Sequence, residues 1–168
     1  MADTSPIRYL VAIGEIGLLQ SLFGRIFIPS VVADELNHHS APPAVRAWMQ
    51  QSPEWLEVMP PSDLEDPAFA GLDPGEKAAL LLGLSLNADL ILVDDRKGAA
   101  AAASKGFAVT GTLGILDLAA ERKLVDLALA LDQLKRTNFR YRPSLLDALL
   151  KKLARAPAAQ AVDYLQKG

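Results

Sequence analysis

Acidic residues stand near the ends of predicted strands or helices at five positions, which are Asp3, Glu35, Glu76 and the adjacent pair Asp94 and Asp95. Gathered around one cleft, their carboxylates would repel one another unless cations compensated the charge. Hard divalent cations take oxygen ligands of this kind. The combination therefore predicts a site in which carboxylates hold metal ions.

Each of these acids also has a local structural explanation. Asp3 and Asp94 can cap the helices that follow them. Glu76 fits a capping box that begins at Asp73, and Glu35 can face solvent. These explanations treat the acids singly and do not account for their combination.

Several other chemistries lack the residues that they need. The chain has no cysteine, which excludes disulfides, zinc-thiolate sites and a cysteine nucleophile and fits a reducing compartment. His38 and His39 lie in a predicted loop without spaced partners, which favours solvated histidines over zinc ligands. Neither a Gly-x-Ser-x-Gly elbow nor a phosphate-binding P-loop is found.

Helices and strands alternate along the first two thirds of the chain, and the last third is helical. A very short strand at Met1 and Ala2 comes first. The apolar spacing then predicts helices over residues 6–13, 16–23, 30–36, 74–87, 97–105, 113–122, 125–136 and 144–155, with a short one after Pro43. Further strands are expected over residues 25–28, 55–59, 89–93 and 107–109.

This order predicts an α/β fold of three layers, α/β/α, with a mostly parallel central sheet of about five strands. The continuous apolar run at 89–93 is typical of a strand covered on both faces. Ligand sites in such sheets lie beyond the carboxyl ends of the strands, where Asp3 and the Asp94–Asp95 pair are expected. Adjacent strand residues point to opposite sides, so only one of that pair is expected to be a direct ligand.

Charge is distributed unevenly, although the net value is only −3. Residues 54–76 carry acids and no bases, whereas residues 135–155 carry seven bases and one acid. A basic stretch can be a solvated helix face or can bind phosphates. The residues predicted to contact nucleic acid are Arg96, Lys97, Arg136, Arg140, Arg142, Lys151 and Lys152.

Three sets of motifs resemble the PIN-domain-like family. The first set is Asp3-Thr4-Ser5-Pro6, the run at 18–24, and Ile28-Pro29-Ser30 continuing to Glu35-Leu36. The others are the segment at 72–79 with Asp73-Pro74-Gly75-Glu76, and the segments Asp94-Asp95-Arg96-Lys97-Gly98 and Gly106 to Gly114. The resemblance covers about residues 3–125. It implies a PIN-like nuclease domain over 1–125 and a helical C-terminal extension over 126–168, packed on the same domain.

The resemblance also implies what the acids do. Asp3, Glu35, Glu76, Asp94 and Asp95 would be the catalytic group, in which Asp3, Glu76 and one or both of Asp94 and Asp95 hold Mg²⁺ or Mn²⁺. Glu76 stands where many PIN nucleases have aspartate. Thr4 and Ser5 would hydrogen-bond a ligating carboxylate or a water, or act only as turn residues.

The activity implied is hydrolysis of RNA by an attacking water, leaving a 5′-phosphate. The resemblance also implies a role as the toxin of a toxin–antitoxin pair, with a small antitoxin as partner. We further expect a homodimer formed through helices 16–23 and 31–36. A PIN-like module that binds RNA or protein without cutting is the alternative. No apolar run reaches the roughly 18 residues of a membrane span, and no targeting signal is found, which predicts a cytoplasmic protein.

Overall fold

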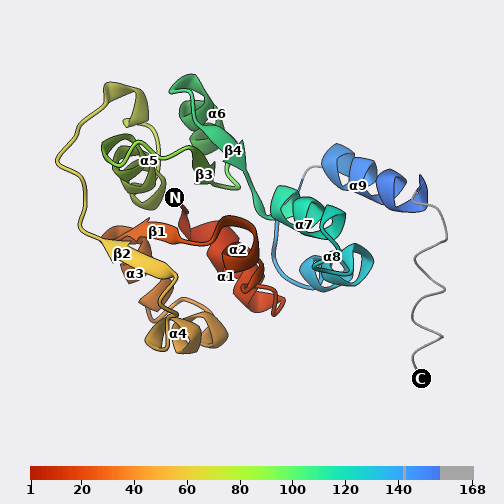
Figure 1. Cartoon of the computed structure of the whole chain (residues 1–168). Helices are drawn as coiled ribbons and strands as arrows, with labels where there is room; N and C mark the ends of the chain where they lie inside the picture. Colours follow the sequence, from red (N-terminus) through yellow and green to blue (C-terminus); the bar gives the residue numbers. More distant parts are fainter. Residues whose placement is uncertain (142, 156–168) are drawn as a thin grey trace.

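A computed structural model of the chain describes residues 1–141 and 143–155. It shows a mixed α/β fold in which the start of the chain lies between the other elements (Figure 1). The helices are α1 (Thr4–Ala12), α2 (Leu18–Phe23), α3 (Ser30–Asn37), α4 (Pro43–Gln50), the 3₁₀ helix η1 (Pro67–Phe69), α5 (Pro74–Ser85), α6 (Arg96–Ser104), α7 (Thr112–Glu121), α8 (Leu127–Lys135) and α9 (Pro143–Arg155). The strands are β1 (Ile26–Pro29), β2 (Leu56–Met59), β3 (Leu90–Leu92) and β4 (Ala108–Thr110).

The strands pair in two parallel sheets. Strands β1 and β2 align Ile26 with Leu56, and β3 and β4 align Leu90 with Ala108. We expected one sheet of about five strands, and this was wrong. The described residues form four strands in two two-stranded sheets.

The first three residues lie between the two sheets and are hydrogen-bonded to both. The backbone N–H of Ala2 donates to the Phe27 carbonyl of β1 (3.0 Å). On the other side, Asp3 N–H donates to the Leu92 carbonyl (2.9 Å), and Leu92 N–H donates to the Met1 carbonyl (2.8 Å). Because α1 begins at Thr4, this segment is too short to form a strand and leaves a single parallel bridge between Ala2 and Leu92.

Strand β3 is covered on both faces, as its continuous apolar sequence predicted. Leu92 packs into the larger core with residues of α1 to α4 and of α7 to α9. Ile91 and Val93 point the other way, into a second core formed with α5 and α6. All three side chains are buried. The alternation places the carboxyl end of β3 between two helical layers.

Helix α5 begins at the predicted capping box. Glu76 N–H donates to Asp73 Oδ1 (2.8 Å), and Asp73 N–H donates to Glu76 Oε2 (3.3 Å). Pro74 occupies the first turn, where its missing N–H costs no hydrogen bond. Reciprocal capping fixes the position of the first turn of α5, and with it the backbone of Glu76.

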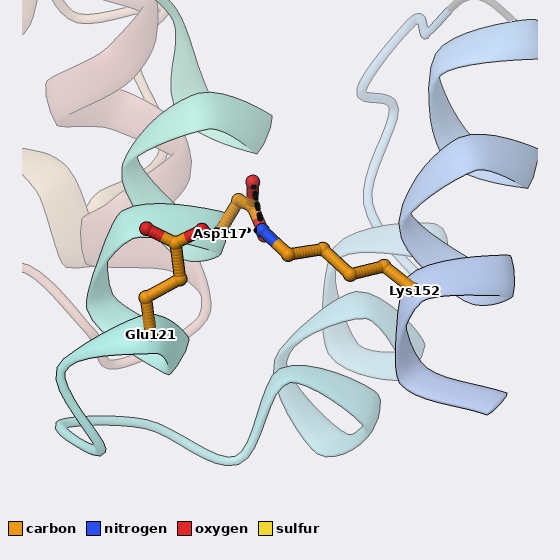
Figure 2. Close-up of polar contacts among 3 residues, drawn as sticks. All are labelled: Asp117, Glu121 and Lys152. Carbon is orange, nitrogen blue, oxygen red and sulfur yellow. Dashed lines mark hydrogen bonds and ion pairs between the residues drawn. The ribbon is translucent and has the colours of Figure 1, made fainter. Parts of the chain in front are cut away.

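The C-terminal helices α7, α8 and α9 lie at one end of the molecule (Figure 1). Leu146 and Leu149 of α9 are buried in the larger core. Lys152 Nζ of α9 donates to Asp117 Oδ1 (2.7 Å) and Oδ2 (2.9 Å) and to Glu121 Oε1 (2.6 Å) of α7 (Figure 2). Within the described ranges, no helix is long and apolar enough to cross a membrane.

Replacing Leu92 with alanine tests how much its side chain, next to the segment that lies between the two sheets, contributes to stability. The side chain is fully buried, so L92A should lower the free energy of unfolding by about 2–5 kcal/mol. Leu124→Ala is the control, because Leu124 is 44% exposed and should change that free energy by less than about 0.5 kcal/mol. Urea unfolding measures both. Equal, small losses would contradict the central position of Leu92.

Candidate active site

Asp3 is one of the two buried carboxylates of the predicted group, together with Glu76. It follows the hydrogen bond to Leu92, occupies the N-cap position of α1 and is only 5% exposed. Burial raises its pKa to about 7, the nearby backbone N–H of Thr4 opposes the rise, and the charges of Asp73, Glu76 and Glu35 add to it. In the described chain its side chain forms no N-cap hydrogen bond to α1.

Glu35 reaches the same region from α3. Thr4 Oγ1 donates a hydrogen bond to Glu35 Oε2, which confirms that Thr4 contacts one of the carboxylates. A Cβ added at Gly75 would lie 2.8 Å from each oxygen of Glu35. The Glu35 carboxylate thus packs against the first turn of α5, where a glycine leaves room for it.

Glu76 combines its capping role with a buried position. It is 5% exposed, and a Cβ added at Gly98 of α6 would lie 3.2 Å from its Oε1. Burial raises the pKa of Glu76, and the charges of Asp73 and Asp95 raise it further. The hydrogen bond from Asp73 and the charge of Lys97 act in the opposite direction. The carboxylates of Asp73, just before α5, and Asp95, just before α6, therefore both act on Glu76.

Asp94 and Asp95 have different surroundings, as expected for neighbours at the end of a strand. Both oxygens of Asp94 are engaged by Thr112, whose backbone N–H donates to Oδ1 (2.7 Å) and whose Oγ1 donates to Oδ2 (2.7 Å). Asp95 is exposed and caps α6 by accepting from Lys97 N–H (2.7 Å). We expected Asp94 to cap α6, and this was wrong, because Asp95 is the N-cap of α6. Asp94 instead accepts hydrogen bonds from Thr112, the first residue of α7.

The pKa of Asp94 reflects this separate environment. Burial raises it, and the two hydrogen bonds from Thr112 act against the rise. A Cβ at Gly111 would lie 2.5 Å from Asp94 Oδ1. Asp94 thus ties the end of β3 to the start of α7, while Asp95 is the member of the pair whose charge acts on Glu76.

The structure brings Asp3, Glu35 and Glu76 into electrostatic contact, with Asp95 acting on Glu76. It adds Asp73, which we had assigned only a capping role. The signal for Asp73 was its place in the capping box, since that motif fixes it beside Glu76. In the part of the chain that the structure describes, no three histidine or acidic side chains are close enough to hold one ion together.

A pocket of about 450 Å³ adjoins this acidic group. Thr4 and Arg8 of α1 line it together with Glu35 and Asp34 of α3, and Val45 of α4 contributes to its apolar wall. His38 also lines the pocket, and its Nδ1 lies 2.8 Å from Ser40 Oγ. Glu35 therefore stands between the buried acids and an open cavity.

The predicted phosphate-binding cations have several environments. Arg136 pairs with Asp132 (2.6 Å), and Lys152 is paired as in Figure 2, so carboxylates already compensate both charges. Arg96 and Lys97 are exposed at the start of α6, beside the acids. Arg140 and Lys151 are exposed, and Arg142 lies outside the described residues.

The pKa of Asp3 predicts how stability depends on pH. Between pH 4 and 7 the unfolded chain has lost this proton while the folded protein keeps it, so stability should fall as pH rises through that window. The difference between 3.8 and about 7 corresponds to roughly 4 kcal/mol. Asp3→Asn should remove this loss and be the more stable protein at pH 8.

Urea unfolding in EDTA across this pH range measures the effect. Asp126→Asn is the matched control, because Asp126 caps α8 away from the site (3.0 Å to Leu129 N–H) and asparagine caps equally well. Its pH profile should match that of the wild type. A D3N profile parallel to the wild type would show that Asp3 titrates normally.

Comparison with known proteins agrees with this architecture. Neither the curated proteins nor the solved structures gave a match. A family model described as "PIN domain" matches residues 1–155, which span all the elements named above. The chain therefore belongs to the PIN-domain family.

Proposed function

We propose that this protein is a metal-dependent ribonuclease that hydrolyses phosphodiester bonds at the group formed by Asp3, Glu35, Glu76 and Asp95. PIN domains are generally nucleases. The observation that carries the proposal is the environment of Asp3, a buried carboxylate whose pKa is raised to about 7 by burial and by three further acids. Such an arrangement destabilises the protein unless a cation or a proton compensates it.

The donor set fits a hard divalent cation such as Mg²⁺ or Mn²⁺. All donors are carboxylate oxygens, and none of these four acids forms a salt bridge with a described lysine or arginine. Magnesium usually keeps several waters and takes only one or two protein carboxylates. A group without three converging ligands is therefore compatible with a largely hydrated ion.

The positions of the side chains suggest a different role for each of them in the reaction. Asp3 and Glu76 would bind the hydrated cation directly, and Asp95 would add negative charge beside it. The cation, when bound, would activate water and neutralise phosphate charge. Glu35, oriented by Thr4 and facing the pocket, would accept a hydrogen bond from the attacking water. In-line attack would break the bond from phosphorus to the 3′ oxygen and leave 5′-phosphate and 3′-hydroxyl ends.

Asp94 has a positioning role in this proposal. Each of its two oxygens accepts a hydrogen bond from Thr112, so Asp94 holds the end of β3 against α7 and thereby fixes the backbone from which Asp95 projects. Loss of this bond would move Asp95 and destabilise the start of α7 together.

A module that binds RNA or protein without cutting is the second candidate. The observation that favours it is that no three acids in residues 1–141 and 143–155 converge on one point.

The family resemblance also supports a toxin role, in which a small antitoxin partner would cover the acidic group. We also propose that the protein forms a homodimer and acts in the cytoplasm.

Glu76→Gln separates the two candidates. Glutamine still accepts the capping hydrogen bond from Asp73, so the fold should persist while the charge is lost. Cleavage of a mixed single-stranded RNA with Mg²⁺ or Mn²⁺ should fall at least about 100-fold. Asp126→Asn should cleave like the wild type. A wild type that leaves RNA intact with either metal would favour the binding module.

Divalent cations should stabilise the wild type, and more so at pH 8 than at pH 6. Asp3 must release its proton before it can bind a cation, so protons compete with the metal. At a tenfold excess over Kd, the gain is about 1.4 kcal/mol, or roughly 3–6 °C in Tm. Thermal melts with and without Mg²⁺ at both pH values measure it, and D3N should respond weakly at both. A pH-independent response would exclude Asp3 as a ligand.

A further inference from the structure

Three aromatic side chains meet where the segment after α8 crosses α1. The Tyr9 and Phe139 rings lie 4.8 Å apart in an edge-to-face arrangement, with planes at 80°. Phe139 and Tyr141 stack with centroids 6.3 Å apart and planes at 23°. Tyr9 Oη donates to Asn138 Oδ1 (3.3 Å), which fixes the segment on α1.

The three rings are not equally buried. Tyr9 and Phe139 are partly buried and pack against the larger core, which explains why the segment stays in place. Tyr141 is 38% exposed. Arg140, between the two stacked rings in sequence, is exposed as well. Phe139 thus anchors the segment, and Tyr141 and Arg140 are available to a ligand.

Arg8 connects this aromatic group with the acidic site. Its guanidinium carbon lies 5.8 Å from the centre of the Tyr9 ring. The same side chain lines the pocket that Thr4 and Glu35 also border. Along α1, the carboxylates, the Arg8 guanidinium and the aromatic group therefore follow one another and form a continuous path. The path ends at the exposed side of Tyr141.

We propose that this path is a binding track for single-stranded RNA, made by Arg8, Tyr9, Phe139, Arg140 and Tyr141. The inference rests on the proposed ribonuclease function and assigns the residues outside the acidic site that hold its substrate. Aromatic rings stack on bases of any sequence, while arginines contact the phosphates between them. Only unpaired bases can expose their faces to such rings, so the substrate is single-stranded rather than duplex.

Binding of labelled RNA to metal-free Glu76→Gln tests the track without cleavage. The probes are an unstructured oligonucleotide and a duplex of the same sequence, followed by fluorescence anisotropy in EDTA. The single strand should bind more tightly. Adding Tyr141→Ala should weaken single-strand binding about 5- to 100-fold, the loss typical of one stacked base.

Two matched variants control for the loss of surface area. Tyr141→Phe keeps the ring and should retain affinity within about twofold. Leu129→Ala removes another exposed apolar side chain, one that is 56% exposed on α8, and should leave affinity unchanged. Thermal melts verify that all variants are folded.

The salt dependence of RNA binding distinguishes the contribution of the Tyr141 ring from that of the Arg140 charge. Arg140→Ala should reduce the slope of log Kd against log salt by about 0.7, the value for one phosphate contact on a single strand. Tyr141→Ala should leave that slope unchanged, because stacking releases no counterions.

The outcomes distinguish this inference from the function on which it rests. Equal binding of single strand and duplex, or full affinity in Y141A, overturns the track even if the wild type cleaves RNA with metal. Selective loss in Y141A without any cleavage by the wild type supports the track and overturns the ribonuclease. Failure of the metal-free protein to bind either RNA overturns the track alone if cleavage persists, and both proposals if it does not.

Discussion

The fixed position of Asp3 is the constraint around which the site is organised. Hydrogen bonds from Ala2 to β1 and from Asp3 to β3 hold the start of the chain between the two sheets. These bonds fix the backbone of Asp3 between the sheets, and burial at this position raises the pKa of its carboxyl group to about 7. Glu35 approaches it from the last turn of α3, and Glu76 approaches it from the first turn of α5. The short segment at the start of the chain thus fixes the position around which these carboxylates lie.

Glycines decide how closely the acids can approach the neighbouring helices. Glu35 lies against Gly75 at a distance where a Cβ would have to displace its carboxylate (2.8 Å). At Gly98 a Cβ would meet Val93 Cγ2 at 2.9 Å and Glu76 Oε1 at 3.2 Å. Gly111 stands in the same relation to Asp94, whose oxygens are additionally held by hydrogen bonds. These glycines belong to the motifs that resemble the PIN family. Their physical role is to leave space for a carboxylate from an earlier element of the chain.

The local features of the sequence predicted the structure well, and the non-local ones did not. The capping box at Asp73 and the buried run through Leu92 depend on neighbouring residues only, and both were confirmed. The five-stranded sheet failed because a two-residue segment cannot extend a ladder beyond one bridge. The partners of Lys152 come from another helix, and no local pattern could reveal that its charge is already compensated. The choice between Asp94 and Asp95 likewise needed the position of α7.

The acidic site also explains why RNA affinity should come from elsewhere on the surface. A chain with a net charge of −3 and buried carboxylates repels phosphate until a cation is bound. Base stacking on Tyr141 would not depend on that electrostatic repulsion. Arg8, whose positive side chain lines the pocket, lies on α1, the helix that follows Asp3. Binding and cleavage would therefore use separate parts of α1. If both proposals hold, the phosphate of bound RNA would supply oxygen ligands in addition to the one or two carboxylates that Mg²⁺ usually takes.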